Sequence, residues 1–193
     1  MRHGFKAQSE RTGAAARAAL GLTTSAPLDP WAYAVHLKVR VLDFRKLSLP
    51  VKTVRQLTIV DGDSWSAMTL RVDSAIGIVL NPAHAPTRQR SDLMHELAHI
   101  ELRHSPTRVE VSGTGLLLLS DYSDEQEQEA DWLAATLLLP REGLVRFRSA
   151  GKSTGEIAAY YGVSESLCEW RLRMTGVDVQ MRRSAPRWYP MPK

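Results

Sequence analysis

The chain has 193 residues and a formal net charge of +4, and its composition, 44% hydrophobic and 24% charged, is typical of a globular protein with an apolar core. The single cysteine, Cys168, excludes a disulfide within the chain and a metal site made only of cysteines. No apolar run is long enough to span a membrane, and no signal-peptide core follows the first basic residues, so we expect a soluble cytoplasmic protein.

The first 63 residues contain one helix signal and one strand signal. Residues 1–27 are expected to form a flexible lead-in. Asp29 can cap a helix with Pro30 at its first position. The apolar face of that helix would carry Trp31, Val35 and Leu37. The stretch VRVLDF then predicts a strand, and residues 45–63 predict a mixture of strand and loop that ends in the turn DGD.

Two antiparallel strands are predicted next. Apolar residues alternate in SWSAMTLRV, where the pattern slips once and then follows Met68, Leu70 and Val72. They alternate again in AIGIVLN. A turn at residues 73–74 would join the strands, and Asn81-Pro82 would end the second one.

Two strong helices follow. The first begins at Ser91 or Asp92 and runs through His104. The second begins near residues 123–124 and runs to Leu139, with Pro140 as its stop. The connection over residues 105–122 contains the run LLLL and is long for a compact protein, so it predicts a short strand pair or a mobile flap.

The last part of the chain is predicted to be helical with a basic end. Residues 153–176 predict a helix, a turn at Gly162 and a second helix, within a helical subdomain over residues 141–178. After Gln180 there are four basic residues and no acidic one. Residues 179–193 are therefore expected to be a solvated basic tail.

The stretch HELAHIELRH has the spacing of a metal site. His95 and His99 are four residues apart, so they share one face of a helix and their ring nitrogens can converge on one ion. Glu96 can reach a water on that ion and act as general base. The competing interpretation is an ordinary helix with surface histidines. The many apolar residues of this helix weigh against it, because polar side chains in a core-facing helix need a partner.

A catalytic zinc takes three protein ligands and keeps one open position. In a continuous helix His104 is rotated by about 900° from His95 and points nearly the opposite way. The metzincin pattern would need Gly and His where this chain has Leu102 and Ser105. His104 is therefore interpreted as a helix C-terminal residue that interacts with the helix dipole.

The third ligand is expected on the second helix, which opens with the acidic stretch DEQEQEAD. Glu127 and Asp131 share one face, so Glu127 can complete the site and Asp131 can accept the second ring N–H of a ligating histidine. Glu125 and Glu129 compete for the third position. Glu129 is rotated by about 200° from Glu127, so at most one of the two faces the metal. Asp124, Glu125 and Glu129 are otherwise explained as a solvated helix N-terminus.

Taken in order, these parts resemble the ImmA/IrrE family of zinc metallopeptidases. The resemblance covers residues 29–176 and rests on an ordered set: the Asp-Pro helix, the strand ending in Asn81-Pro82, Arg88-x-Arg90, HELAH, EQEADWLAATLLLP and the final helix pair. Ala98 stands where the family usually has Gly. The resemblance implies Zn²⁺ ligands at His95, His99 and Glu127, with Glu96 catalytic.

The implied fold is α+β. It would consist of a minimal thermolysin-like core over residues 28–140, with a small antiparallel or mixed sheet beside the metal-binding helices, and a helix-turn-helix-like subdomain. The implied function is an intracellular endopeptidase that cleaves or otherwise inactivates a helix-turn-helix transcriptional repressor, in phage, mobile elements or stress responses.

The sequence leaves open how the substrate binds and which residue stabilises the oxyanion. An extended substrate is expected to pair with an edge strand within residues 64–80. His84, His104 and Tyr122 are candidates to stabilise the oxyanion, and each also has a structural explanation.

A non-catalytic module that binds a repressor or DNA, or a partner in a toxin–antitoxin pair, is the alternative function. Residues 151–178 contain three basic and four acidic residues, which argues against direct binding of nucleic acid. We therefore expect a protein partner and no membrane association.

Overall fold

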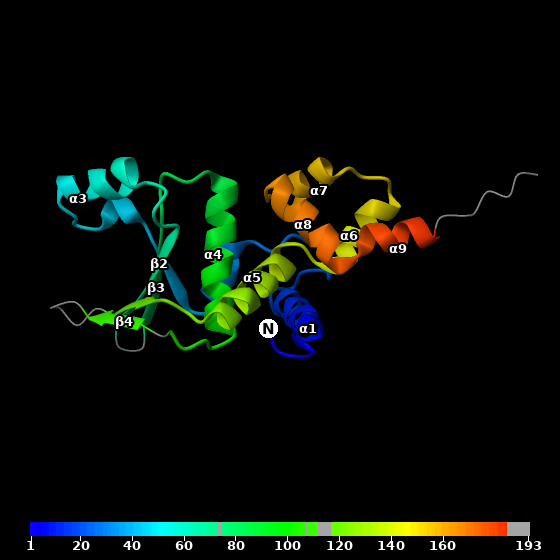
Figure 1. Ribbon diagram of the computed structural model, residues 1–193, viewed down its shortest axis with the longest axis horizontal. Coiled ribbons are helices and arrows are strands. Elements are labelled where there is room, and N and C mark those ends of the chain that lie inside the picture. Colours follow the sequence, from blue (N-terminus) through cyan, green and yellow to red (C-terminus); the bar gives the residue numbers. More distant parts are fainter. Residues whose placement is uncertain (73–74, 107, 112–116, 185–193) are drawn as a thin grey trace, which may run out of the picture.

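The computed structural model describes residues 1–72, 75–106, 108–111 and 117–184. A mixed β-sheet lies at one end of the molecule, and helices extend from it to the other end (Figure 1). The expected mixture of helices and strands is confirmed. None of the helices in these ranges is long and apolar enough to cross a membrane.

The described strands form a five-stranded sheet in the order β1-β3-β2-β5-β4. β1 (Val39–Leu42) runs parallel to β3 (Ala75–Leu80), and β2 (Ala67–Val72) is antiparallel to β3, as the alternating pattern predicts. β5 (Leu117–Ser120) pairs antiparallel with both β2 and β4 (Arg108–Val111). The long connection over residues 105–122 therefore contains a strand pair. The turn expected at residues 73–74 lies outside the described residues.

Two expectations about residues 64–80 are wrong. β2 and β3 each have a strand on both sides, so neither offers a free edge to a substrate. The inward side chain at the centre of β2 is Thr69 rather than Met68 or Leu70, which are only half-buried. A threonine can face inward here because its hydroxyl has a hydrogen-bond partner, the half-buried Glu96.

Residues 1–27 contain a packed helix instead of a flexible lead-in. α1 (Phe5–Ala19) lies against α5 (Asp124–Leu138), with Phe5 fully buried. Arg17 anchors it: this side chain is 1% exposed and donates from Nη2 to the Leu137 carbonyl at 2.6 Å and from Nε to the Ala26 carbonyl at 2.9 Å. The sequence pattern missed this helix because its anchor is a buried arginine rather than an apolar stripe.

The expected Asp-Pro helix is present, but its buried face is different. α2 (Pro30–His36) is capped by Asp29, whose carboxylate accepts from the Ala32 N–H at 3.2 Å. Val35 is 76% exposed, and Tyr33 is buried instead. The Tyr33 hydroxyl donates to Glu101 at 3.0 Å, which joins this side of α2 to the helix over residues 86–101.

Residues 45–63 are mainly helical rather than strand and loop. A short 3₁₀ turn, η1 (Phe44–Lys46), is followed by α3 (Val51–Arg55) and the π-helical turn η2 (Gln56–Val60). Neither α3 nor η2 has a buried residue. This explains why no apolar periodicity marks them in the sequence.

The helix α4 (Pro86–Glu101) lies between the sheet and α5 (Figure 1). Leu93, Leu97 and Ala98 on α4 are fully buried in the main core. The helix begins and ends earlier than expected. Arg103 takes a left-handed conformation with φ 54°, its N–H donates to the Ile100 carbonyl, and the His104 N–H donates to the His99 carbonyl. This is a Schellman motif with arginine at the position usually held by glycine, so the helix stops before His104.

The C-terminal part of the chain forms four helices, α6 (Arg141–Ser149), α7 (Thr154–Tyr161), α8 (Glu165–Thr175) and α9 (Val177–Ser184). The expected helix pair joined at a glycine is α7 and α8. Gly162 ends α7 with φ 66° and lies against Arg90 of α4, where an added Cβ would be 3.2 Å from Nε. Arg90 also pairs with Asp29 at 3.1 Å, so it joins α4 to both α2 and the α7–α8 turn. α9 occupies part of the expected tail, and residues 185–193 lie outside the described residues.

The anchoring role of Arg17 gives a testable prediction. Arg17→Ala should lower the free energy of unfolding by about 3 kcal/mol, because buried carbonyls on α1 and α5 lose their charged donor. Arg11→Ala, on the exposed side of the same helix, should change it by less than about 0.5 kcal/mol. Urea unfolding followed by circular dichroism measures both, and equal effects would contradict the packing of α1.

Candidate metal centre

The candidate centre is built from two helices that approach closely. Ala98 on α4 and Ala130 and Ala134 on α5 are buried, and their small side chains permit this approach. The start of α5 is fixed by a capping box, in which the Ser123 hydroxyl accepts from the Gln126 N–H and the Gln126 side chain accepts from the Ser123 N–H. Glu127 therefore lies in the first turn, facing α4.

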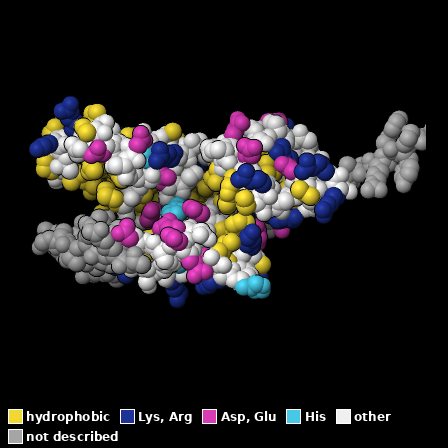
Figure 2. All heavy atoms as spheres, in the orientation of Figure 1, with side chains coloured by type: hydrophobic (Ala, Val, Ile, Leu, Met, Phe, Trp, Pro, Cys, Tyr) yellow, Lys and Arg dark blue, Asp and Glu magenta, His cyan; other side chains and the backbone are white. Residues whose placement is uncertain are grey.

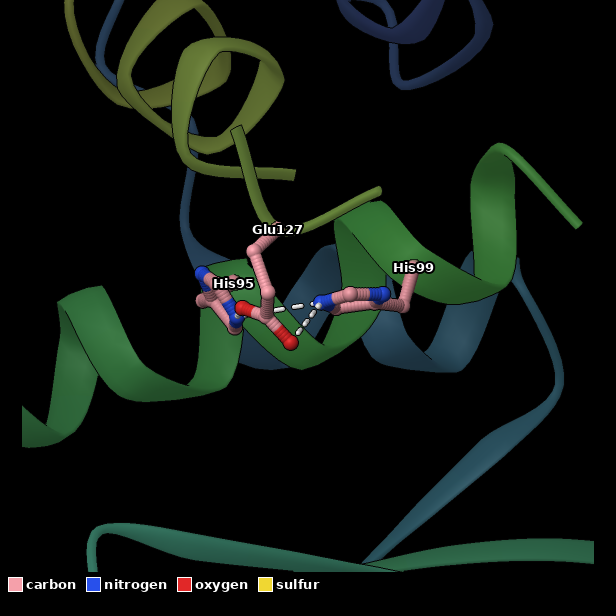
Figure 3. A group of neighbouring side chains, drawn as sticks. All are labelled: His95, His99 and Glu127. Carbon is pink, nitrogen blue, oxygen red and sulfur yellow. Dashed lines mark hydrogen bonds and ion pairs between the residues drawn. The ribbon is translucent and has the colours of Figure 1, made fainter. Parts of the chain in front are cut away.

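His95, His99 and Glu127 come together across this helix contact. Figure 3 shows the two imidazoles extending from α4 and the Glu127 carboxylate reaching them from α5. Nε2 of His95 is 3.0 Å from Nε2 of His99 and 3.2 Å from Glu127 Oε2, and Nε2 of His99 is 3.7 Å from Glu127 Oε1. In a tetrahedral zinc site with bonds of about 2.0–2.1 Å, ligand atoms lie roughly 3.3 Å apart. The three donors fit such an ion.

Two further polar side chains touch this cluster. Asp131 Oδ1 lies 2.9 Å from Nδ1 of His95, on the side of the ring away from the other donors. The Thr69 hydroxyl donates to Glu96 Oε2 at 2.5 Å and so holds that carboxylate between α4 and the sheet. The sequence reasoning expected Asp131 at this place and did not single out Thr69. Its signal would have been a hydroxyl between the apolar residues Met68 and Leu70 of the strand AMTLRV.

An aromatic ring covers the other histidine. The Tyr122 ring stacks on His99 with a centroid distance of 3.8 Å and an interplanar angle of 26°. Burial and the nearby charges of Glu96 and Glu127 raise the pKa of Tyr122 to about 12, so the phenol stays protonated at neutral pH. His84, the other aromatic candidate for the oxyanion, lies elsewhere, with Nδ1 3.1 Å from Asp92.

The charges of the cluster favour a cation. Burial would lower the pKa of His95, but its hydrogen bonds to Asp131 and Glu127 raise it to about 10. Burial and the positive charge on His95 lower the pKa of His99 to about 4. Burial raises the pKa of Glu96. One positive charge is thus held among several carboxylates, which Figure 2 shows gathered around a histidine at the centre of this face. A divalent ion between the two rings would take the place of that proton.

His104 and Glu129 differ from expectation. Because α4 ends before it, His104 folds back instead of pointing away, and its Nδ1 lies 3.0 Å from Nδ1 of His99. Glu129 faces away from the three donors, and this agrees with the expectation. It is buried, however, and not solvated, and Arg2 donates to both of its carboxylate oxygens. Glu125 is exposed, as expected, and Glu101 accepts from Tyr33. Nothing in the sequence pattern marked Arg2.

The donor set defines what the centre can do. Two neutral imidazoles and one carboxylate would hold a divalent ion and leave one position open. Such an arrangement is suited to activating water for hydrolysis.

The geometry predicts which glutamate matters for metal affinity. Glu127→Gln should weaken Zn²⁺ binding by at least about tenfold, because a neutral amide replaces the only charged donor. Glu125→Gln, an exposed change in the same turn of α5, should leave the affinity unchanged. Competition with a chromogenic chelator measures both. Equal affinities for the two variants would exclude Glu127 as a ligand.

Comparison with known families agrees with this arrangement. Residues 55–173 match the model of the peptidase M78 family, described as the IrrE N-terminal-like domain. The match includes both helices of the candidate centre and the α7–α8 pair. No curated protein matches the chain. Because the match spans more than half of the sequence, the resemblance to ImmA/IrrE proteins is confirmed, and the chain belongs to the IrrE-like M78 peptidase family.

Proposed function

We propose that this protein is a cytoplasmic zinc-dependent endopeptidase. The observation that carries the proposal is the convergence of His95, His99 and Glu127, with Glu96 held beside them by Thr69. In this proposal residues 28–140 form a minimal thermolysin-like core, and residues 141–178 form a helix-turn-helix-like subdomain.

Zn²⁺, when bound by the three donors, would polarise the scissile carbonyl and acidify the attacking water. Glu96 takes the proton from that water and passes it to the leaving amine. Burial raises the pKa of Glu96, which makes this carboxylate a better proton acceptor than an exposed glutamate. Thr69 orients the carboxylate, and Asp131 holds His95 with Nε2 toward the metal.

Tyr122 is proposed to stabilise the oxyanion. It lies in the site, stacked on His99, and its phenol remains a donor at neutral pH. His104 and His84 are assigned no contact with substrate, because His104 lies behind His99 and His84 pairs with Asp92.

The proposed substrate is a helix-turn-helix transcriptional repressor, and its cleavage or inactivation would relieve repression in a mobile element, a phage or a stress response. Family membership supports a peptidase, and the specific partner is our inference from the resemblance. Such a substrate would reach the centre without pairing to β2 or β3, since both are internal strands.

Removal of the base tests the mechanism. Glu96→Gln should lower the cleavage rate of a helix-turn-helix repressor substrate by about 10²- to 10⁴-fold, because general base catalysis is lost. Zinc content should stay at the level of the unaltered protein, since Glu96 is not a ligand. Gel electrophoresis of timed digests and elemental analysis measure the two quantities.

The matched control is Glu101→Gln, which alters a half-buried glutamate of the same helix that pairs with Tyr33 away from the three donors. It should cleave like the unaltered protein. If Glu96→Gln also cleaves normally, the mechanism is wrong. If the unaltered protein binds the repressor without cutting it, the non-catalytic regulatory module is the better description.

Direct DNA binding is not expected from the C-terminal helices. Arg171, one of the three basic residues between 151 and 178, is fully buried and donates to the Leu139 carbonyl and to Glu10. Lys152 pairs with Glu156. Few cations remain to contact phosphates. The full chain should therefore not retard operator DNA in a gel at physiological salt, and a salt-dependent shift would contradict this.

A further inference from the structure

The two histidines of the candidate centre differ in the group that lies next to Nδ1 of each ring. His95 has a carboxylate next to its Nδ1, Asp131, which lies on the surface with 68% of its side chain exposed. Among the residues that the structure describes, no carboxylate lies next to Nδ1 of His99. Its Nδ1 faces another imidazole, His104, at 3.0 Å. The Schellman turn at Arg103 produces this contact, because it reverses the chain directly after α4.

The direction of this contact follows from metal ligation. If His99 binds the ion through Nε2, its proton lies on Nδ1, and that N–H donates to His104 Nδ1. The proton of neutral His104 must then be on Nε2. This atom is buried without a hydrogen-bond partner among the described residues, and its neighbour is Glu129 Oε2 at 3.6 Å. A movement of a few tenths of an ångström would make that contact a hydrogen bond.

Glu129 is held as a buried anion at the end of this chain. Its side chain is only 3% exposed. Arg2 donates to it from Nε at 2.8 Å, from Nη2 at 2.7 Å and from its backbone N–H at 3.0 Å.

We propose that His104, Glu129 and Arg2 form a positioning relay behind His99. The relay fixes His99 with Nε2 toward the ion. The carboxylate of Glu129 polarises His104, and His104 in turn polarises His99, so that His99 becomes a stronger electron donor to the metal. The relay deepens the proposed function, since it rests on a metal bound by His99. It also makes residues before α1 part of the support of the metal centre, although they are more than ninety positions away in sequence from His99.

The side chains of His104 and Glu129 are both nearly fully buried. Their burial argues that these polar residues act on the metal and do not only fill space. An apolar side chain at 104 or 129 would fill the same space without the cost of burying charge. The donations instead run from His99 to His104 and on toward Glu129, and Arg2 donates to Glu129 from the other side. In a site shielded from water, a fixed charge affects its neighbours more strongly than Asp131 can at the surface.

The test measures zinc affinity by chelator competition in the full chain. His104→Leu should weaken zinc binding by about 10- to 100-fold, the usual cost of removing a partner of a ligating histidine. His104→Asn should recover part of this loss, because its carboxamide oxygen can still accept from His99. Arg2→Ala should weaken binding in the same direction and by less, and it should leave the fold intact because more than half of this side chain is exposed.

A double variant separates a relay from independent packing effects. His104→Leu combined with Glu129→Gln should lose no more affinity than His104→Leu alone, since both changes interrupt one chain of contacts. The visible absorption spectrum of the Co²⁺-loaded protein should change in His104→Leu, because the ring of His99 is no longer fixed. Losses that add fully, or an unchanged spectrum, would overturn the relay.

The matched control is His84→Leu, which removes another buried histidine whose Nδ1 faces a carboxylate, away from the metal donors. It should bind zinc like the unaltered protein, and a loss equal to that of His104→Leu would overturn the proposal. Absence of zinc binding by the unaltered protein would overturn both the proposed function and the relay. Zinc binding that is equally tight in the unaltered, His104→Leu and Glu129→Gln proteins would overturn only the relay.

Discussion

The close contact between α4 and α5 is the constraint on which the candidate centre depends. Two donors come from one helix and the third from the other, so the separation of the helices sets the distances among His95, His99 and Glu127. Ala98 and Ala130 are buried at zero exposure in this contact. A larger side chain at either position would force the helices apart and separate the donors, since packed cores tolerate little added volume.

The surrounding elements hold that contact from both sides. The sheet supports α4 through β2 and β3 and brings Thr69 to Glu96. On the other side α1 lies against α5, with the Arg17 guanidinium bonded to a carbonyl in the last turn of that helix. The helix α5, which carries Glu127 of the candidate centre, is thus fixed by polar contacts at both ends, the Ser123 cap at its start and Arg17 near its end.

The sequence was informative where periodicity and capping act locally. Four-residue spacing placed His95 and His99 on one face, and alternation indicated the β2–β3 pair. It failed where a single residue departs from common preference. Arginine at 103 takes a conformation that usually selects glycine, so the end of α4 and the position of His104 could not be predicted. Arg2 and Arg17 act through hydrogen bonds to residues more than 100 positions away in the sequence, which no local pattern records.

The contact between Arg90 and Gly162 has a consequence for how the two ends of the molecule move. The α7–α8 turn rests on a side chain from the first half of α4, and any residue larger than glycine there would meet Arg90 and adopt an unfavourable φ. A rigid-body displacement of the C-terminal helices would therefore press on the helix that carries two of the donors. A force applied to α7 and α8 would thus reach α4 through Arg90, without any contact at His95, His99 or Glu127.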